Sequence, residues 1–217
     1  MKTNKNITII TLYDGYEYDP KLRTGFGFSC LIKIGGKSIL FDTGSESRTL
    51  LYNMQQLKIK PEEVEIVMLS HSHGDHTGGL KGFLHVNGHK AKVYKPRVFK
   101  KPREIGTNVY STGALDGFIK EQALAVKSPR GLIVITGCAH PGVVNIVKKA
   151  QDIEKIIYLV LGGFHLGDGR AVIKEFKALG VQKVAPCHCT GDLAIGQFRE
   201  EYKDNFIANG VGKIIEI

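Results

Sequence analysis

The sequence lacks the features that mark several classes of protein. It has no run of about 18 apolar residues, the length that a membrane-spanning helix needs. Its N-terminal segment has neither the apolar length nor the small-residue cleavage site of a signal peptide, so we expect a cytoplasmic protein with no membrane partner. No low-complexity tract occurs, and 42% apolar with 24% charged residues is typical of a globular protein. We expect residues 1–217 to form one domain.

Cysteine is scarce as well. The chain has four cysteines, too few for a disulfide scaffold at this length. Cys138, Cys187 and Cys189 each lie within two residues of a histidine. This arrangement favours reduced thiols near a metal site over disulfides.

Positive charge is abundant, with a formal net charge of +9 at pH 7. Such a charge attracts anionic ligands, either phosphorylated small molecules or nucleic acid. A local excess occurs at Lys95, Arg97, Lys100, Lys101 and Arg103. Because charge runs usually face water, we interpret this stretch as a solvated loop and disfavour nucleic acid as a partner. The sequence leaves the oligomeric state open, a homodimer included.

Hydrophobic patterning predicts a layered α/β protein, with an antiparallel opening followed by alternating strands and helices. A Gly35-Gly36 hairpin turn is expected between the second and third strands. The expected strands are Ile7–Leu12, Phe28–Ile34, Ser38–Phe41, Glu65–Leu69, Ala91–Tyr94, Leu132–Thr136, Ile156–Leu161, Lys183–Pro186 and Lys213–Ile217. The expected helices are Arg48–Leu57, Thr77–Leu84, Val143–Ala150, Ala171–Leu179 and Leu193–Tyr202. The stretch between Tyr94 and Gly117 shows no clear pattern.

A dense group of metal-binding residues follows the fourth expected strand: His71, His73, Asp75 and His76. In extended backbone, positions i and i+2 point to the same side, so His71 and His73 can share one metal ion. Gly74 then permits a sharp turn. Beyond it, Asp75 and His76 can face a second ion about 3.5–4 Å from the first. A solvated polar loop is the alternative, but clustering three of eight histidines by chance is improbable.

This His-x-His-x-Asp-His pattern resembles the signature of the metallo-β-lactamase superfamily. The resemblance implies an αββα sandwich, in which two mixed sheets pack face to face with helices on the outer faces. It also implies that an aspartate in a Phe-Asp-Thr-Gly turn helps to hold the histidine loop. Phe41-Asp42-Thr43-Gly44 matches that turn, which makes Asp42 a positioning residue that does not touch metal.

The resemblance extends to Thr136–Gly142, where His140 corresponds to the third ligand of the first metal ion. Three imidazoles leave one position of a tetrahedral zinc ion open, so His71, His73 and His140 would suffice for a catalytic site. Cys138 is expected to pack beside the site, without binding metal.

His188 corresponds to the family's last ligand of the second ion, together with Asp75 and His76. Its neighbours Cys187 and Cys189 suggest a thiolate metal site as an alternative. A Cys-x-Cys pair without a second pair at zinc-finger spacing argues against that alternative.

One departure from the family concerns the bridge between the ions. Many members carry an aspartate where this chain has Gly162-Gly163, and the next carboxylate is Asp168. A missing bridge would weaken the second metal. His165 would then fill part of that space as a substrate contact or as an extra metal ligand.

The motifs Gly-Cys-Ala-His, Gly-Gly-Phe-His-Leu and Cys-His-Cys-Thr-Gly resemble a subgroup named for a methanopterin-pathway dihydropterin synthase, which joins a pterin to a phosphorylated aminobenzene riboside. We expect two zinc ions, and iron or manganese also suits these ligand types. The expected reaction is hydrolysis of an anionic small molecule, with Asp75 orienting water or accepting a proton and His165 contacting an oxyanion. A pterin-synthase-type transferase and a nuclease are the alternatives.

Overall fold

The structure is a computed structural model that describes residues 6–96 and 98–217, so Arg97 of the basic stretch lies outside the described residues. By its internal contacts the chain divides into two compact units. Unit 1 runs to Lys95 and includes Asn209–Ile217, and unit 2 is Pro96–Ala208. Each unit contains one six-stranded sheet with parallel and antiparallel pairs, which confirms the two mixed sheets. That residues 1–217 form a single domain stays a prediction.

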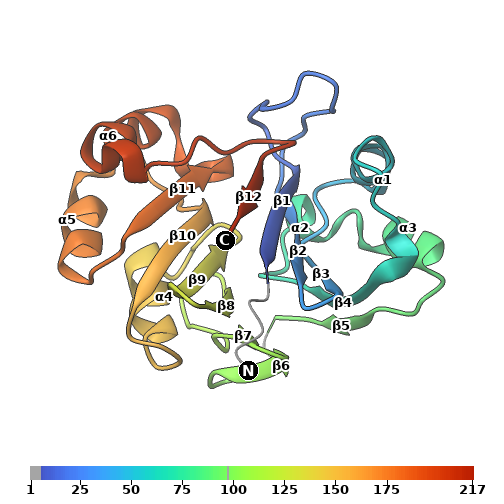
Figure 1. The fold of residues 1–217 in the computed structure, drawn as a ribbon, viewed down its shortest axis with the longest axis horizontal. Helices are drawn as coiled ribbons and strands as arrows, with labels where there is room; N and C mark the ends of the chain where they lie inside the picture. The colour runs from blue at the N-terminus through green and yellow to red at the C-terminus, as the bar shows by residue number, and fades with distance from the viewer. Residues whose placement is uncertain (1–5, 97) are drawn as a thin grey trace. The chain divides into compact units, whose positions relative to one another are not determined.

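The sheet of unit 1 has the strand order β12-β1-β2-β3-β4-β5. The C-terminal strand therefore pairs with the first strand, and β12 lies beside β1 in Figure 1. The β2–β3 turn is the predicted Gly35-Gly36 hairpin, and both glycines have positive φ, at 57° and 80°. The strands are β1 Ile7–Tyr13, β2 Ser29–Ile34, β3 Lys37–Phe41, β4 Val64–Met68, β5 Lys92–Tyr94 and β12 Ile214–Glu216.

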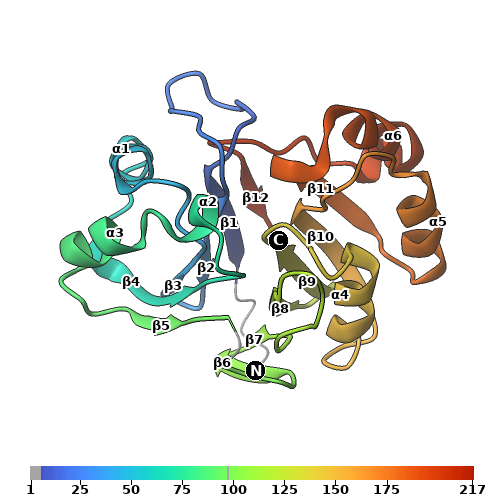
Figure 2. The ribbon, with the colours of Figure 1, turned by 180° about the vertical axis from the view of Figure 1, so that it is seen from behind.

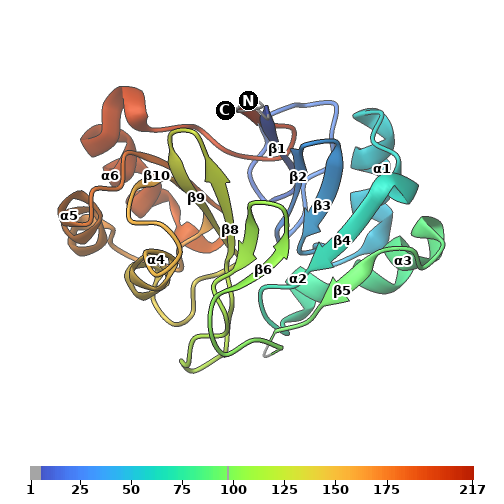
Figure 3. The ribbon, with the colours of Figure 1, turned by 60° about the horizontal axis from the view of Figure 1, so that its bottom comes forward.

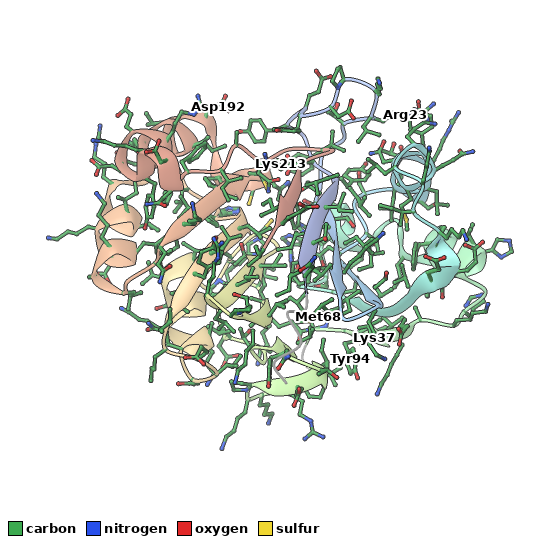
Figure 4. The ribbon with its side chains drawn as sticks, in the orientation of Figure 1. Arg23, Lys37, Met68, Tyr94, Asp192 and Lys213 are labelled. Atoms are coloured by element: carbon green, nitrogen blue, oxygen red, sulfur yellow. The ribbon has the colours of Figure 1, made fainter. Side chains whose placement is uncertain are left out.

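Helices α1 (Ser47–Gln56) and α3 (Leu80–Asn87) cover one face of this sheet, as Figure 3 shows. Leu50 of α1 and Phe83 of α3 are fully buried against apolar strand residues such as Val67. Burying such side chains contributes roughly 1.5–3 kcal/mol each. At the end of the sheet, Met68 of β4 pairs with Tyr94 of β5, and both are labelled in Figure 4. The histidine segment follows directly after Met68.

The helix expected to begin near Thr77–Gly78 and to end at about Leu84 is present as α3, but it begins and ends three residues later. The structure has a four-residue helix α2 (Gly74–Thr77) and the separate helix α3, with Gly78 and Gly79 between them. A Cβ on Gly78 would lie 2.0 Å from the carbonyl oxygen of Ser45, and one on Gly79 would lie 2.1 Å from that of Thr43. The two glycines thus let the histidine segment pack tightly against the loop that follows β3.

The sheet of unit 2 has the strand order β11-β10-β9-β8-β7-β6. Strand β10 pairs in parallel with both β9 and β11, so the carboxyl ends of these three strands lie along one edge of the sheet. The strands are β6 Arg103–Gly106, β7 Val109–Ser111, β8 Leu124–Ser128, β9 Gly131–Thr136, β10 Ile157–Gly163 and β11 Lys183–Cys187. The first three continue the sheet as an antiparallel run that sequence patterning did not predict.

Three helices, α4 (Val143–Ala150), α5 (Arg170–Ala178) and α6 (Asp192–Tyr202), cover one face of the unit 2 sheet, as Figure 2 shows. Each was predicted to within one residue at either end. Their core is aromatic as well as aliphatic, because Phe164, Phe176 and Phe198 pack with ring centroids 5.5–5.9 Å apart. This packing anchors the start of the loop after β10, at Phe164, against α5 and α6.

No helix in the described part of the chain combines the length and the apolar character that crossing a bilayer would need.

Candidate metal centre

In unit 1, the predicted ligands follow β4 in a single short segment. The ligand atoms of His71, His73 and Asp75 all lie within 4.8 Å of one another. The rings of His71 and His73 have centroids 4.7 Å apart, as expected for residues i and i+2 of extended backbone. The ring of His76 lies 4.2 Å from that of His71. These four side chains come together as the sequence predicts.

Asp75 and His76 also lie side by side. The Oδ2 of Asp75 is 3.3 Å from Nε2 of His76. A carboxylate oxygen and an imidazole nitrogen at this separation can bind the same cation, since zinc binds both ligand types at about 2.0–2.2 Å. The pair is therefore well placed to hold a metal ion.

The carboxylate of Asp42 holds this segment in place through hydrogen bonds. Its fully buried carboxylate accepts hydrogen bonds from the Ser70 backbone N–H (2.7 Å) and the Ser70 hydroxyl (2.7 Å), and it contacts Nδ1 of His76 at 2.7 Å. The Ser70 Oγ in turn lies 2.8 Å from Nδ1 of His71. This confirms that Asp42 holds the histidine loop. Carboxylate–histidine pairs of this kind fix the ring orientation and direct Nε2 toward a metal ion.

The electrostatics of His76 follow from the same contact. Burial lowers the pKa of His76, but the charge of Asp42 and its hydrogen bond, helped by Asp75, raise that pKa to about 10. In the metal-free protein the ring is therefore protonated at neutral pH. A metal ion at Nε2 must displace this proton, which couples metal binding to proton release.

In unit 2, Glu121 plays the part that Asp42 plays in unit 1. Its buried carboxylate accepts hydrogen bonds from the backbone N–H groups of Cys138 (2.9 Å), Ala139 (2.8 Å) and His140 (2.9 Å). It also contacts Nδ1 of His140 at 2.8 Å. One side chain thus fixes both the loop after β9 and the ring of His140, again directing Nε2 outward.

The other predicted residues of unit 2 follow β10 and β11. The ring of His165 is exposed and lies 5.0 Å from that of His140, measured between centroids. His188 is buried, and its Nε2 lies 3.3 Å from Sγ of Cys138. The ligand atoms of Cys138, His165 and Cys189 all lie within 4.8 Å of one another. The strand-end loops of unit 2 therefore gather three histidines and two thiols.

Backbone strain is concentrated in these loops. The described chain has eight non-glycine residues with positive φ, and four belong to the segments just described. They are Asp42 (56°), Ala139 (62°), His165 (50°) and His188 (51°). Such conformations cost of order 1–3 kcal/mol each and tend to cluster at functional sites, where surrounding contacts hold them in place. Holding these residues in strained conformations therefore lowers the free energy of unfolding of the fold.

Comparison with known proteins shows to which family a chain with this arrangement of ligands belongs. The model of the metallo-beta-lactamase superfamily matches residues 22–148. The chain is also 33% identical to the 7,8-dihydropterin-6-methyl-4-(beta-D-ribofuranosyl)-aminobenzene-5'-phosphate synthase of Methanocaldococcus jannaschii, with 97% of each chain covered. The chain belongs to the metallo-beta-lactamase superfamily. Members of this superfamily typically bind metal ions, which agrees with the ligand groups of both units.

Solved structures agree with the superfamily fold. The crystal structure of Tm1679, described as a metal-dependent hydrolase of the beta-lactamase superfamily, matches with a TM-score of 0.78 and 28% identity, covering 97% of this chain and 99% of that one. The fold protein YhfI from Bacillus subtilis matches with a TM-score of 0.69 at 14% identity, covering 97% and 99%. The second likeness concerns the fold alone.

Sequence reasoning missed Glu121 altogether. The residue lies in the stretch before β8 where no hydrophobic period is visible, and nothing in its neighbourhood marks it as a partner of His140. The only signal is a single carboxylate beside the apolar run Ala123–Val126, which is a poor place for an unpaired charge. The sequence shows that Cys138 and Cys189 each lie near a histidine. It does not show that the two thiols lie close together, because that depends on the order of the strands.

Proposed function

We propose that this superfamily member is a metal-dependent hydrolase of phosphorylated or otherwise anionic small molecules. The observation that carries the proposal is the way in which three imidazoles are held. Each has a buried carboxylate or a serine hydroxyl at Nδ1, within 2.7–2.8 Å, so that Nε2 is the ligand atom. The rings are His71, His76 and His140, and their partners are Ser70, Asp42 and Glu121, respectively.

The proposed centre binds two metal ions, with zinc favoured by the imidazole and carboxylate ligands. This assignment follows the order of the superfamily motifs along the chain, and the donor chemistry of each unit fits it. The proposed ligands of the first ion are His71, His73 and His140. The proposed ligands of the second ion are Asp75, His76 and His188.

When bound, the two ions lower the pKa of water toward neutrality and polarise a carbonyl or phosphoryl oxygen. The residues of the chain supply orientation and proton transfer. Asp75 lies at the start of α2 with its carboxylate beside Nε2 of His76, where it can orient water and accept its proton. His165 is exposed next to His140 and can donate a hydrogen bond to an oxyanion or a phosphate oxygen.

The charge of the protein supports an anionic substrate. The sequence carries 30 lysine and arginine residues against 21 aspartate and glutamate residues. A net charge of +9 raises the local concentration of anions near the surface and increases their rate of encounter. Phosphorylated small molecules fit this preference.

A second candidate is a synthase that transfers a pterin without hydrolysis. The supporting observation is the match to the Methanocaldococcus jannaschii synthase, which spans nearly the whole of both chains. The same cationic centre would then neutralise the charge of a departing diphosphate, while Asp75 and His165 keep the contacts described above.

The two candidates are separated by offering the zinc-loaded protein two kinds of substrate. One assay measures release of nitrophenolate from nitrophenyl phosphate esters, and of phosphate from diphosphates. The other incubates a pterin diphosphate with an aminobenzene riboside phosphate and looks by mass spectrometry for the joined product. Turnover in the first assay supports the hydrolase, and product in the second supports the synthase.

Variants connect the activity to the site. Removing a first-ion ligand from either unit, in His71→Ala or in His140→Ala, should abolish turnover. His85→Ala provides the matched control, because His85 is exposed on α3 and belongs to neither ligand group. Full turnover in either ligand variant would contradict the proposed mechanism.

A further inference from the structure

Two cysteines in unit 2 lie where metal ligands gather. Cys138 follows β9, His165 follows β10, and Cys189 follows β11. Because these three strands are parallel neighbours, their carboxyl ends lie at the same edge of the sheet, and the loops that follow converge there. Cysteines separated by 51 residues are brought together in this way.

The distances match those of a metal site with thiolate ligands. The Sγ atoms of Cys138 and Cys189 and a ring nitrogen of His165 are all within 4.8 Å of one another. The Sγ of Cys138 is also 3.3 Å from Nε2 of His188. A tetrahedral zinc ion, with Zn–S of about 2.3 Å and Zn–N of about 2.0–2.1 Å, places neighbouring sulfur and nitrogen ligands about 3.5 Å apart.

The surroundings of Gly163 explain why a thiol lies at the end of β10, where many family members carry an aspartate. A Cβ on Gly163 would lie 2.7 Å from Sγ of Cys189, 3.1 Å from Cδ2 of His188 and 2.3 Å from the carbonyl oxygen of Gly137. Any side chain at position 163 would therefore overlap the thiol. At Gly163, the end of β10 is therefore closed to a carboxylate, first by the backbone carbonyl of Gly137 and then by the Cys189 thiol.

We propose that Cys138 and Cys189 bind a soft metal ion as thiolates, together with one ring nitrogen of His165, whose other ring N–H stays available for the substrate contact proposed above. The proposal deepens the proposed function and rests on it, because the site shares its surroundings with His188 of the second ion. Each thiol releases its proton to solvent when the metal binds. Two sulfurs and one nitrogen leave a fourth position open, as in catalytic zinc sites with Cys₂His ligands.

The ligand set also determines which metals the site prefers. Thiolates favour zinc, cadmium and copper(I) over magnesium and manganese, which prefer oxygen. A site built only from imidazole and carboxylate would discriminate less strongly against manganese. The alternative is that the thiols make only weak hydrogen bonds, such as that from Cys189 Sγ to the Cys138 carbonyl oxygen at 3.7 Å.

Cobalt(II) substitution of the full-length protein distinguishes these alternatives, because a thiolate bound to cobalt gives an intense charge-transfer absorption that imidazole and carboxylate do not give. We expect this absorption in the parent protein and a loss of intensity in Cys138→Ser and in Cys189→Ser. The double variant should lose it completely. In His71→Ala the absorption should persist, since unit 2 supplies all three ligands.

Cys30→Ser is the matched control. Cys30 is buried in β2 of unit 1, where burial, followed by the charge of Asp42, raises the pKa of its thiol. Its replacement should leave the cobalt spectrum unchanged. Zinc should also protect Cys138 and Cys189 from alkylation by iodoacetamide, measured by peptide mass spectrometry, which tests the proposal even if a serine variant misfolds.

The outcomes separate the two proposals. Stoichiometric cobalt without charge-transfer absorption would overturn the thiolate site and leave the proposed hydrolase intact. Thiolate absorption in a protein that turns over no substrate would support the site and count against the proposed function. Absence of cobalt binding would overturn both.

Discussion

The replacement Glu121→Gln tests the positioning role of a residue that the sequence did not reveal. The Glu121 carboxylate takes part in four contacts of 2.8–2.9 Å, three to backbone N–H groups and one to Nδ1 of His140. Glutamine retains one oxygen and turns the other into an NH₂ group that faces donors. Two hydrogen bonds to a charged acceptor are then lost, at roughly 1.5–3 kcal/mol each. We expect the free energy of unfolding to fall by about 3–6 kcal/mol.

Urea unfolding followed by far-ultraviolet circular dichroism measures this loss, because the sequence contains no tryptophan for fluorescence. Zinc affinity should fall in parallel, by about 10–100-fold, as is typical when the partner of a metal-bound histidine is removed. Glu104→Gln is the matched control, because Glu104 is exposed and its carboxylate accepts a weak hydrogen bond from the Asn108 N–H at 3.1 Å. A loss below about 1 kcal/mol for Glu121→Gln, with unchanged zinc affinity, would refute the reasoning.

Three further predictions concern the histidine loop and the thiol group. Asp42→Asn keeps a residue that tolerates the positive φ at this position but turns an NH₂ group toward donors, so metal affinity measured by competition with a chromophoric chelator should fall about 10–100-fold. In chelator-treated protein, the raised pKa of His76, about 10 against about 6.5 unfolded, stabilises the fold fully below about pH 6.5. That contribution should be lost as pH rises toward about 10, and a flat profile of unfolding free energy across this range would count against the Asp42–His76 pair. Gly163→Ala should cost about 1–3 kcal/mol in urea unfolding through overlap with the Gly137 carbonyl and should displace Cys189, and an unchanged midpoint would contradict the close packing.

Much of the fold could be predicted from the sequence because local patterning is strong in it. The amphipathic spacing of Val143–Ala150 gave the bounds of α4 without error, since its apolar residues all face one sheet. The β6–β7 hairpin was missed because its strands are only four and three residues long, too short to show an apolar alternation in the sequence. Helix α2 was missed because four residues are too few to show a helical period. Gly78 and Gly79, which separate it from α3, serve a close approach to Ser45 and Thr43.

The candidate site also has a part that the sequence reveals and a part that it does not. The segment from His71 to His76 was recognisable because its ligands are adjacent in the sequence and their spacing alone brings them together. Contacts across strands were not recognisable, because they depend on which strands are neighbours. Glu121 reaches His140 across 19 residues, and Cys138 reaches His188 across 50. The spacing of the cysteines therefore could not reveal that parallel pairing of β9, β10 and β11 brings Cys138 and Cys189 together.

The central proposal, that these imidazoles are metal ligands, is tested most directly by elemental analysis of protein purified without chelators. We predict at least two metal ions per chain in the parent and a loss of metal in both His71→Ala and His140→Ala, each measured at matched protein concentration. His85→Ala should keep the parent value. A parent protein without stoichiometric metal, or ligand variants that retain all of it, would contradict the account.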